Sequence, residues 1–296
     1  MDSHVLKLYK QKLVEIMAGF DAFCSANGYS YFACSGTAIG AVRHHGFIPW
    51  DDDIDVYMPR EDYDRLMANR QVLNGSNYAI KTLGDDGYIY AFAKFYDVNT
   101  TLVELKRFPT CVIGVYIDIF PLDEVSGTFT EIQRKKNLYD KYYTAFQDTY
   151  RKFCLKDFIY FLYHIRGKRC MELLQIPFMS DITKKKVREK FLRFEQEWAK
   201  DKGDKVMAHS CVYSLEKELF PKDWFTGYQL YDFENIKIRL TTNNDQYLTK
   251  LFGDYMTPPP MKKRISTHAH YYLNLKEGLS NSQVEERVKA GEYLVY

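Results

Sequence analysis

The hydrophobic pattern changes several times along the first part of the chain, and each change predicts an element. Apolar residues recur near every 3.6 positions over residues 4–27, which indicates an amphipathic helix. A short strand is expected over residues 31–34, followed by a tight turn at Ser35-Gly36-Thr37 and a helix over residues 38–45. Gly46 then suits the position just after a helix end, where a left-handed backbone favours glycine.

Beyond residue 50 the pattern is first that of strands and then that of helices. Runs of β-branched and aromatic residues between turn signals predict strands at 53–58, 78–83, 88–96, 101–106 and 114–119, with a helix at 60–70. Helical patterns then dominate residues 127–202. The last part is mixed, with paired strands over 228–240, a helix over 243–251 and an extended segment at Pro258-Pro259-Pro260.

This order of elements predicts an α+β protein, in which a mixed β-sheet core is flanked by helices and carries a helical insertion. We expect a core over residues 1–126 and a basic helical insertion over residues 127–205. A C-terminal mixed segment over residues 206–296 is expected to complete the core.

A dense run of carboxylates at Asp51-Asp52-Asp53-Ile54-Asp55 stands at the start of the second predicted strand. In an extended chain, Asp51, Asp53 and Asp55 point to one face, and Asp52 and Ile54 point to the other. Like charges this close repel each other unless a cation neutralises them. Hard oxygen ligands in this spacing suit Mg²⁺ or Mn²⁺, which leave coordination positions for phosphate oxygens.

Two simpler interpretations of the acidic run are a calcium loop and a solvated acidic turn. A calcium loop of the EF-hand type needs glycine at its sixth position and glutamate at its twelfth, where this chain has Val56 and Asp62. The solvated turn stays open, although residues 54–58 alternate like a half-buried strand. The spacing therefore favours metal-dependent chemistry on a phosphate-containing substrate.

Composition narrows the classes of partner and location. A formal net charge of +2 gives no reason to expect a nucleic-acid partner. The six cysteines include no C-x-x-C pair and no cluster with zinc spacing, which favours buried thiols in a reducing compartment. The start of the chain lacks the pattern of a signal peptide, and no apolar stretch is long enough to span a bilayer. We expect a cytoplasmic protein.

The order of motifs around the acidic run points to a fold. Gly36 lets the backbone approach a ligand closely, and a helix that follows offers free N–H groups to phosphate, with hydroxyls from Ser35 or Thr37 nearby. A turn of this kind, a helix and then a D-x-D strand is similar to the layout of the nucleotidyltransferase fold. The third carboxylate is best placed at Asp118, in an apolar strand where burial needs a partner. Alternatively, Asp118 caps or bonds a neighbouring loop.

Several longer stretches resemble the LicD family. They are residues 35–56, Pro59-Arg60-Glu61-Asp62-Tyr63, Asp118-Ile119-Phe120-Pro121-Leu122-Asp123, and Phe252-Gly253-Asp254-Tyr255-Met256 with the three prolines that follow. The resemblance implies transfer of a phospho-alcohol, most often phosphocholine, from a CDP-linked donor to a glycan. Fukutin-related ribitol-phosphate transferases are more distant relatives.

Matched to that motif, Asp53 and Asp55 are the D-x-D metal ligands, Asp51 is the acid before them, and Gly36 and Thr37 are the phosphate-side turn. Asp118 is expected either to bind a second metal ion or to accept the proton of the attacking hydroxyl.

Further candidates surround this set. Arg43 is expected to clamp a phosphate, or else to be a solvated helix charge. Trp50 is expected to stack on the base or cover the metal, or else to anchor a turn. The resemblance implies that Arg264 and His268 close over the site. A choline group would need an aromatic cage, for which Tyr88, Tyr90, Phe92 and Tyr116 are candidates that the sequence does not rank.

The helical region 127–205 combines an apolar aromatic run at 158–163 with basic residues such as Lys184-Lys185-Lys186. Such a region is expected either to lie on an anionic membrane surface, at the inner face of the membrane, or to pack on the core with a solvated basic side.

Two other functions of the protein stay open. One is nucleotidyl transfer that releases pyrophosphate, and the other is that of an inactive module that binds a glycan or a membrane surface.

Overall fold

The computed structural model of this chain describes residues 3–105, 111–152, 155–164, 167–266, 268 and 270–296. The α-helices are α1 (Ser3–Asn27), α2 (Ser35–His44), α3 (Arg60–Asn69), α4 (Phe129–Asp148), α5 (Leu155–Tyr163), α6 (Gly167–Gln175), α7 (Asp181–Trp198), α8 (Leu215–Glu218), α9 (Asn244–Phe252) and α10 (Asn281–Lys289). The strands are β1 (Phe32–Ala33), β2 (Asp55–Pro59), β3 (Tyr78–Lys81), β4 (Ala93–Asp97), β5 (Thr101–Val103), β6 (Tyr116–Val125), β7 (Lys205–Met207), β8 (Phe220–Pro221), β9 (Tyr228–Phe233), β10 (Ile236–Thr241), β11 (Tyr272–Asn274) and β12 (Leu294–Val295). Short 3-10 helices cover Arg70–Leu73, Ile176–Phe178, Lys222–Phe225 and Met261–Lys263.

The central sheet has the strand order β1-β2-β6-β4-β3. β2 and β6 run parallel and pair Asp55 with Asp118. β4 lies on the other side of β6 and runs antiparallel to it, so that Lys94 is paired with Asp118. Because neighbouring strands are about 4.8 Å apart, these three residues form a short row across the sheet. The far end of β6 pairs with β7, which pairs with β8.

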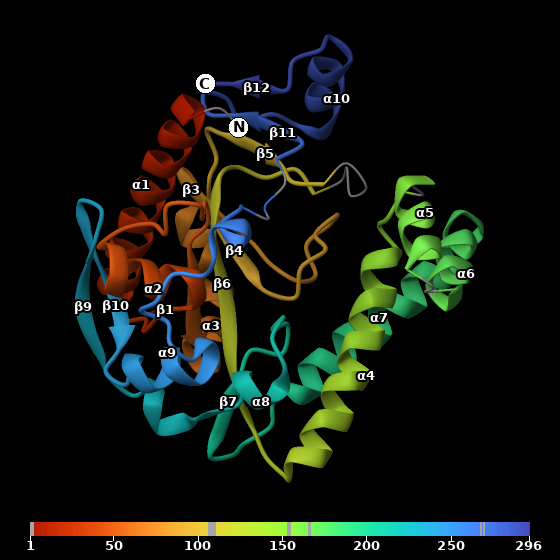
Figure 1. Ribbon diagram of the computed structural model, residues 1–296. Helices are drawn as coiled ribbons and strands as arrows, with labels where there is room; N and C mark the ends of the chain where they lie inside the picture. The colour runs from red at the N-terminus through yellow and green to blue at the C-terminus, as the bar shows by residue number, and fades with distance from the viewer. Residues whose placement is uncertain (1–2, 106–110, 153–154, 165–166, 267, 269) are drawn as a thin grey trace.

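Helix α1 supplies much of the apolar core beside this sheet (Figure 1). Its buried side chains recur at helical spacing and include Leu13, Met17 and Phe20. The ring of Phe20 lies 5.4 Å from that of Phe95 on β4. The helix predicted over residues 4–27 is therefore confirmed, with its apolar face on the sheet.

Helices α4 and α7 lie side by side and extend away from the sheet, with α5 and α6 at their far end (Figure 1). α4 begins at a capping box of Thr128 and Glu131, and Ser180 caps the start of α7. Rings of both helices, such as Tyr139 and Trp198, form a second apolar cluster together with β7. The helical character predicted for residues 127–202 is confirmed in the part that the structure describes.

The C-terminal part returns to the N-terminal elements. β9 and β10 form the predicted hairpin, and α9 covers the predicted helix and lies against α2. Further on, β11 pairs with β5 and with β12 to form a small sheet of order β12-β11-β5. Residues far apart in the sequence are thus brought beside the acidic run of the N-terminal half.

Several predicted boundaries were wrong. Helix α2 begins at Ser35, so that Ser35-Gly36-Thr37 is its first turn and not a separate loop. At the other end His45, and not Gly46, takes the left-handed conformation, with φ 55°. Residues 88–92 are not strand, and β4 begins only at Ala93. β6 runs six residues past the predicted end, because Pro121 falls within the parallel pairing with β2. Lys106, at the end of a predicted strand, lies outside the described residues.

The fold class is confirmed as α+β, with a mixed sheet, many flanking helices and a nucleotidyltransferase-like arrangement of the acidic strands. Among the described helices, none combines the length and the apolar character that crossing a membrane requires.

Candidate active site

The first turn of α2 forms one side of the site. Cys34 stands at the N-cap in an extended conformation without a side-chain cap, so the first N–H groups of the helix depend on other partners. A Cβ at Gly36 would lie 2.4 Å from an oxygen of Asp51, which means that only glycine allows this carboxylate against the helix. The positive end of the helix dipole favours an anion at this place.

The hydroxyl of Thr37 has a structural partner. It accepts a hydrogen bond of 2.9 Å from the backbone N–H of Asp55, and its side chain is buried. Thr37 thus joins α2 to the start of β2. The backbone N–H of Ser35 donates to the hydroxyl of Tyr247 at 2.9 Å, which ties the same turn to α9.

The acidic run alternates as the extended-chain argument predicts. Asp51, Asp53 and Asp55 all line one cavity of about 380 Å³, whereas Asp52 and Ile54 are buried away from its walls. The cavity is also lined by Ser35 and Gly36 of α2 and by His268. A volume of this size suits a small ligand or part of a larger one.

The carboxylates on this wall are buried close together, and their negative charges repel one another. Burial and the charge of Asp51 raise the pKa of Asp53 well above its usual range. Burial and the charge of Asp53 have the same effect on the pKa of Asp55. One oxygen of Asp55 is buried without a hydrogen-bond partner in the described structure. Such an arrangement is costly until a cation shares the charge.

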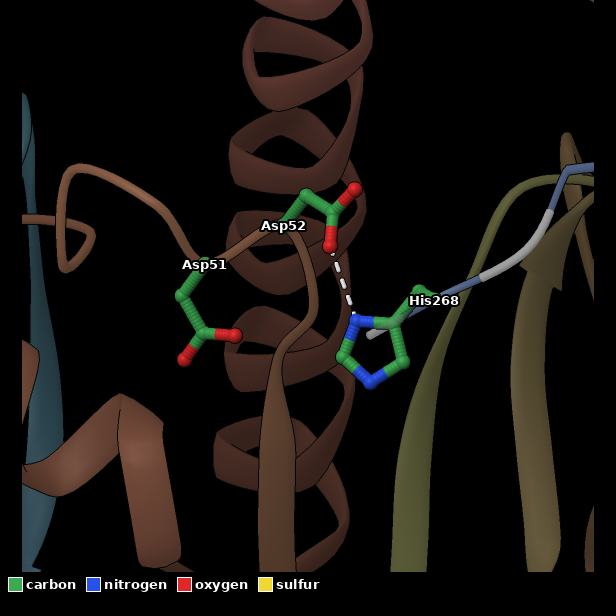
Figure 2. A group of neighbouring side chains, drawn as sticks. All are labelled: Asp51, Asp52 and His268. Carbon is green, nitrogen blue, oxygen red and sulfur yellow. Dashed lines mark hydrogen bonds and ion pairs between the residues drawn. The ribbon is translucent and has the colours of Figure 1, made fainter. Parts of the chain in front are cut away.

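The imidazole of His268 lies beside the acidic run, and Figure 2 shows its contact with Asp52 next to Asp51. Its Nδ1 is 2.8 Å from an oxygen of Asp52, and its Nε2 is 3.2 Å from an oxygen of Asp53. The hydrogen bond to Asp52 and the nearby acids raise the pKa of His268 to about 9. Burial raises the pKa of Asp52, but the bonds from His268 and Ser266 outweigh it, and the net shift is downward. The imidazolium is thus the cation that faces this wall.

Asp118 is adjacent to Asp55 as predicted, but it has a partner that sequence reasoning missed. The ammonium of Lys94 lies 2.7 Å from an oxygen of Asp118 and 3.8 Å from one of Glu104. Burial raises the pKa of Asp118 to about 6 against the opposing charge of Lys94. The strand register could have indicated Lys94, because a lysine in an apolar strand needs a buried acid nearby.

Arg43, Trp50 and Arg264 form a group of their own near the C-terminal end of α2. Burial and the neighbouring guanidinium of Arg264 lower the pKa of Arg43, and Arg43 donates to the carbonyl oxygen of Tyr255. The guanidinium of Arg264 lies 5.3 Å from the centre of the Trp50 ring. These three residues are not among those that line the cavity described above.

The cavity is also lined by Tyr213 and Glu218, which lie in segments that the sequence did not single out, and by Phe252 of the LicD-like stretch 252–256. Burial raises the pKa of Glu218 to about 7, and the hydroxyl of Tyr57 donates to it at 3.0 Å. Nothing in the local pattern around Glu218 marks it, because the contact depends on how β8 and α8 return to the central sheet.

The residues present fit a divalent cation. Asp51, Asp52 and His268 bring possible ligand atoms within 4.8 Å of one another, and His268 can be a ligand only in its neutral form. Asp53 and Asp55 add carboxylates to the same neighbourhood, and the buried oxygen of Asp55 has no other partner in the described structure. A carboxylate-rich set of this kind suits a hard cation. The more specific ligand set of Asp53, Asp55 and Asp118 stays a prediction.

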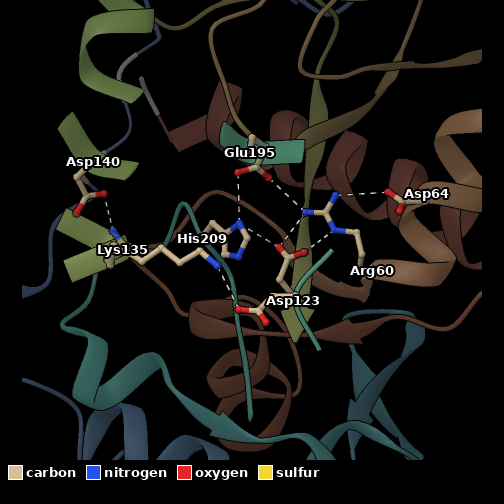
Figure 3. Close-up of polar contacts among 9 residues, drawn as sticks. Arg60, Asp64, Asp123, Lys135, Asp140, Glu195 and His209 are labelled. Atoms are coloured by element: carbon tan, nitrogen blue, oxygen red, sulfur yellow. Dashed lines mark hydrogen bonds and ion pairs between the residues drawn. The ribbon is translucent and has the colours of Figure 1, made fainter. Parts of the chain in front are cut away.

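A second group of buried polar residues lies where side chains of α3, β6 and α7 meet (Figure 3). Asp123, Glu195 and His209 also bring ligand atoms within 4.8 Å of one another. Here Arg60 donates to both oxygens of Asp123 and, at 3.3 Å, to Glu195. The ring of His209 is stacked on Trp198 at 3.8 Å. This group joins α3, β6 and α7 by ion pairs within the chain.

Together, a mixed sheet with acids on adjacent parallel strands and a helix N-terminus beside them define a nucleotidyltransferase-like protein. Residues 28–158 match the family model described as LicD/FKTN/FKRP, nucleotidyltransferase domain. The resemblance to the LicD family stated above is therefore confirmed over residues 28–158.

Among curated proteins, the chain is 27% identical over 269 residues to the lipopolysaccharide cholinephosphotransferase LicD of Haemophilus influenzae, covering 89% of this chain and 96% of that protein. Two uncharacterized proteins, of Rickettsia prowazekii and Rickettsia typhi, are each 42% identical over 50 residues. That segment is 17% of this chain and 19% and 16% of those two proteins.

Proposed function

We propose that this protein transfers a phospho-alcohol, most simply phosphocholine, from a CDP-activated donor to a hydroxyl of a cell-surface glycan or its precursor, and releases CMP. The observation that carries the proposal is the wall formed by Asp51, Asp53 and Asp55, where one oxygen of Asp55 is buried without a hydrogen-bond partner among the described residues. The similarity to the lipopolysaccharide cholinephosphotransferase of Haemophilus influenzae supports the choice of alcohol and acceptor.

In this proposal Asp53 and Asp55 hold Mg²⁺ or Mn²⁺, with Asp51 or Asp118 as further ligands. When bound, the ion would neutralise the pyrophosphate and the departing CMP. The first turn of α2 would face phosphate oxygens through its N–H groups, because Ser35 and Gly36 line the cavity. Tyr213 and Phe252 give the same cavity an aromatic wall, which suits the base of the donor.

Two cationic groups, the arginine pair Arg43 and Arg264 and the imidazolium of His268, belong to the proposed site. Burial and the charge of Arg264 lower the pKa of Arg43, which means that the two guanidinium groups repel each other. An anionic donor placed between them would relieve this repulsion. His268 contacts Asp52 and Asp53 from a segment of the C-terminal part. Catalysis would thus require residues 1–126 and 206–296 together, with residues 127–205 as an insertion.

The insertion is the part that we propose contacts the membrane. Large apolar side chains are exposed on α5, on α6, on the 3-10 helix Ile176–Phe178 and at the start of α7: Leu155, Ile159, Tyr160, Leu162, Tyr163, Met171, Leu174, Phe178 and Ile182. Exposed lysines at 185 and 186 accompany them, which favours an anionic membrane surface. Arg169 does not contribute, because it pairs with Asp148 at 2.7 Å. An acceptor anchored in the inner leaflet would then reach the cavity at the cytoplasmic face.

The test is release of CMP by the purified protein with Mg²⁺, a mixture of acceptor glycans and CDP-choline, CDP-ethanolamine, CDP-ribitol or CDP-glycerol in parallel. We expect metal-dependent CMP release with one donor, lost with EDTA and in Asp55→Asn. Asp232→Asn, which changes an exposed acid on β9, serves as the matched control. Release of pyrophosphate from a nucleoside triphosphate would instead support nucleotidyl transfer. Metal-independent binding to liposomes without either release would support an inactive module.

A further inference from the structure

Lys94 is buried beside the acidic wall without being part of it. It stands in the middle of β4, its side chain is 1% exposed, and the strand register pairs it with Asp118. Lysine is almost never buried this fully unless an acid accompanies it. The sheet thus places a carboxylate, a carboxylate and an ammonium on three adjacent strands, at Asp55, Asp118 and Lys94.

Aromatic rings enclose the ammonium of Lys94. It lies 3.3 Å from the centre of the Tyr116 ring, 4.5 Å from that of Tyr90 and 5.3 Å from that of Phe92. The hydroxyls of Tyr90 and Tyr116 both donate to Glu104, whose carboxylate also faces the ammonium at 3.8 Å. Cation–π contact and ion pairing therefore act on the same group.

The two neighbouring carboxylates of the row differ in what they can still bind. Asp55 keeps a buried oxygen with no partner in the described structure, so it can accept a cation. An oxygen of Asp118 is already bonded to a fixed ammonium at 2.7 Å. A divalent ion placed at Asp118 would stand against that ammonium, and like charges in a buried site repel strongly.

From this contrast we infer that Lys94 is a positioning residue that takes the place of a second divalent ion, so that the site binds a single ion on the side of Asp51, Asp53 and Asp55. Asp118 then stays an oriented carboxylate, free to accept the proton of the attacking hydroxyl rather than to bind metal. This inference rests on the proposed function and specifies its metal content.

The inference also excludes three aromatic residues as the cage for the alcohol of the donor. Tyr90, Phe92 and Tyr116 already enclose a cation of the chain itself, so they do not form the cage for the alcohol of the donor. A quaternary ammonium is larger than the ammonium that fills this space. The alcohol would bind elsewhere along the cavity.

The experiment is a titration of the full-length protein with Mn²⁺, in which free Mn²⁺ is counted by electron paramagnetic resonance. We expect one ion in the wild type, one in Asp118→Asn and at least about tenfold weaker binding in Asp55→Asn. Lys94→Met is expected to gain a second ion, while Lys94→Arg keeps one. Lys136→Met is the matched control, because Lys136 is also a buried lysine paired with an aspartate, Asp140, but on α4.

Two ions in the wild type that fall to one in Asp118→Asn would overturn the assignment of Lys94 and leave the proposed function intact. No Mn²⁺ binding by the wild type would overturn both. Circular dichroism would show whether Lys94→Met folds. If it does not, the number of Mn²⁺ ions bound by the wild type and by Asp118→Asn still tests the inference, because both proteins keep Lys94.

Discussion

Two groups in this molecule each combine buried acids with a histidine, but they differ in how far the charge of the acids is balanced. One is the acidic wall of Asp51, Asp53 and Asp55 with His268, and the other is the buried group of Asp123, Glu195 and His209 with Arg60. In the second group, burial raises the pKa of Asp123, but the charges of His209 and Arg60 outweigh it, and the net shift is downward. In the first, the pKa of Asp53 stays well above its usual range.

The difference separates a structural ion-pair network from a site prepared for a ligand. Arg60 lies where a metal ion would have to bind in the second group, and it bonds two of the three candidate ligands. The acidic wall lines a cavity, and within the described part of the chain one oxygen of Asp55 has no hydrogen-bond partner. Charge that the chain has not neutralised marks the functional group better than the number of acids does.

The largest expected effect comes from removing a carboxylate of the acidic wall. Asp53→Asn or Asp55→Asn should lower metal-dependent CMP release about a thousandfold, because the charge that holds the cation is lost. Neither change should lower the melting temperature in metal-free buffer, since each relieves repulsion. Activity and thermal unfolding on the same preparations test this, and activity near that of the wild type in either variant would remove these residues from the site.

The opposite result is expected in the ion-pair network. Arg60→Met leaves Asp123 and Glu195 buried without their cation, which should lower the free energy of unfolding by about 3 to 5 kcal/mol. Arg65→Met is the control, because its pair with Asp62 is half exposed and should contribute at most about 1 kcal/mol. Urea denaturation measures both. Equal, small effects would mean that the network does not stabilise the fold.

The effect of Mg²⁺ on the stability of the protein should also show which of the two groups binds the ion. Mg²⁺ at a hundred times its dissociation constant should stabilise the wild type by about 2.7 kcal/mol, because it binds the folded chain alone. Asp55→Asn should lose this gain, whereas Glu195→Gln, although less stable from the start, should keep it. Thermal unfolding with Mg²⁺ and after EDTA shows the difference. A gain that disappears in Glu195→Gln would move the metal site to the second group.

The acidic wall was predictable because it depends on local rules. The alternation of side chains in an extended chain places Asp51, Asp53 and Asp55 together, whatever the rest of the fold does. To predict that Asp118 lies beside Asp55, one must also know that the two strands are neighbours, and the family resemblance supplied this. The structure pairs the two strands in parallel. The helix predicted over residues 4–27 and the hairpin of β9 and β10 followed from periodicity in the same way.

What sequence reasoning missed depends on contacts between distant segments. Lys94 is identified only by the register of β4 on β6, and Glu218 only by the return of α8 to Tyr57. The start of α2 was misplaced because Ser35-Gly36-Thr37 has turn composition, while tertiary contacts such as the bond of Thr37 to Asp55 hold it in the helix. Local propensity carries no information on such contacts.

The smallest effect concerns Glu218, a carboxylate in the cavity wall that accepts a hydrogen bond from the hydroxyl of Tyr57. Its pKa of about 7 in the folded state is above the ordinary value of 4.5, so the folded state binds this proton more tightly than the unfolded state does. The stability that this proton contributes is fully present below about pH 4.5 and is lost as the pH rises through about 7.

Glu218→Gln removes that titration and keeps an oxygen that can accept the bond from Tyr57. Between pH 5 and pH 8, the wild type should therefore lose about 2 kcal/mol of unfolding free energy relative to Glu218→Gln. Glu216→Gln, at an exposed neighbour on the same helix, should follow the wild type. Urea denaturation across this pH range measures the three curves. If the free energies of unfolding of the wild type and Glu218→Gln changed in parallel with pH, Glu218 would ionise as an ordinary glutamate does. The part of the cavity around Glu218 would then resemble the ion-pair network, whose charge is balanced, and not the acidic wall.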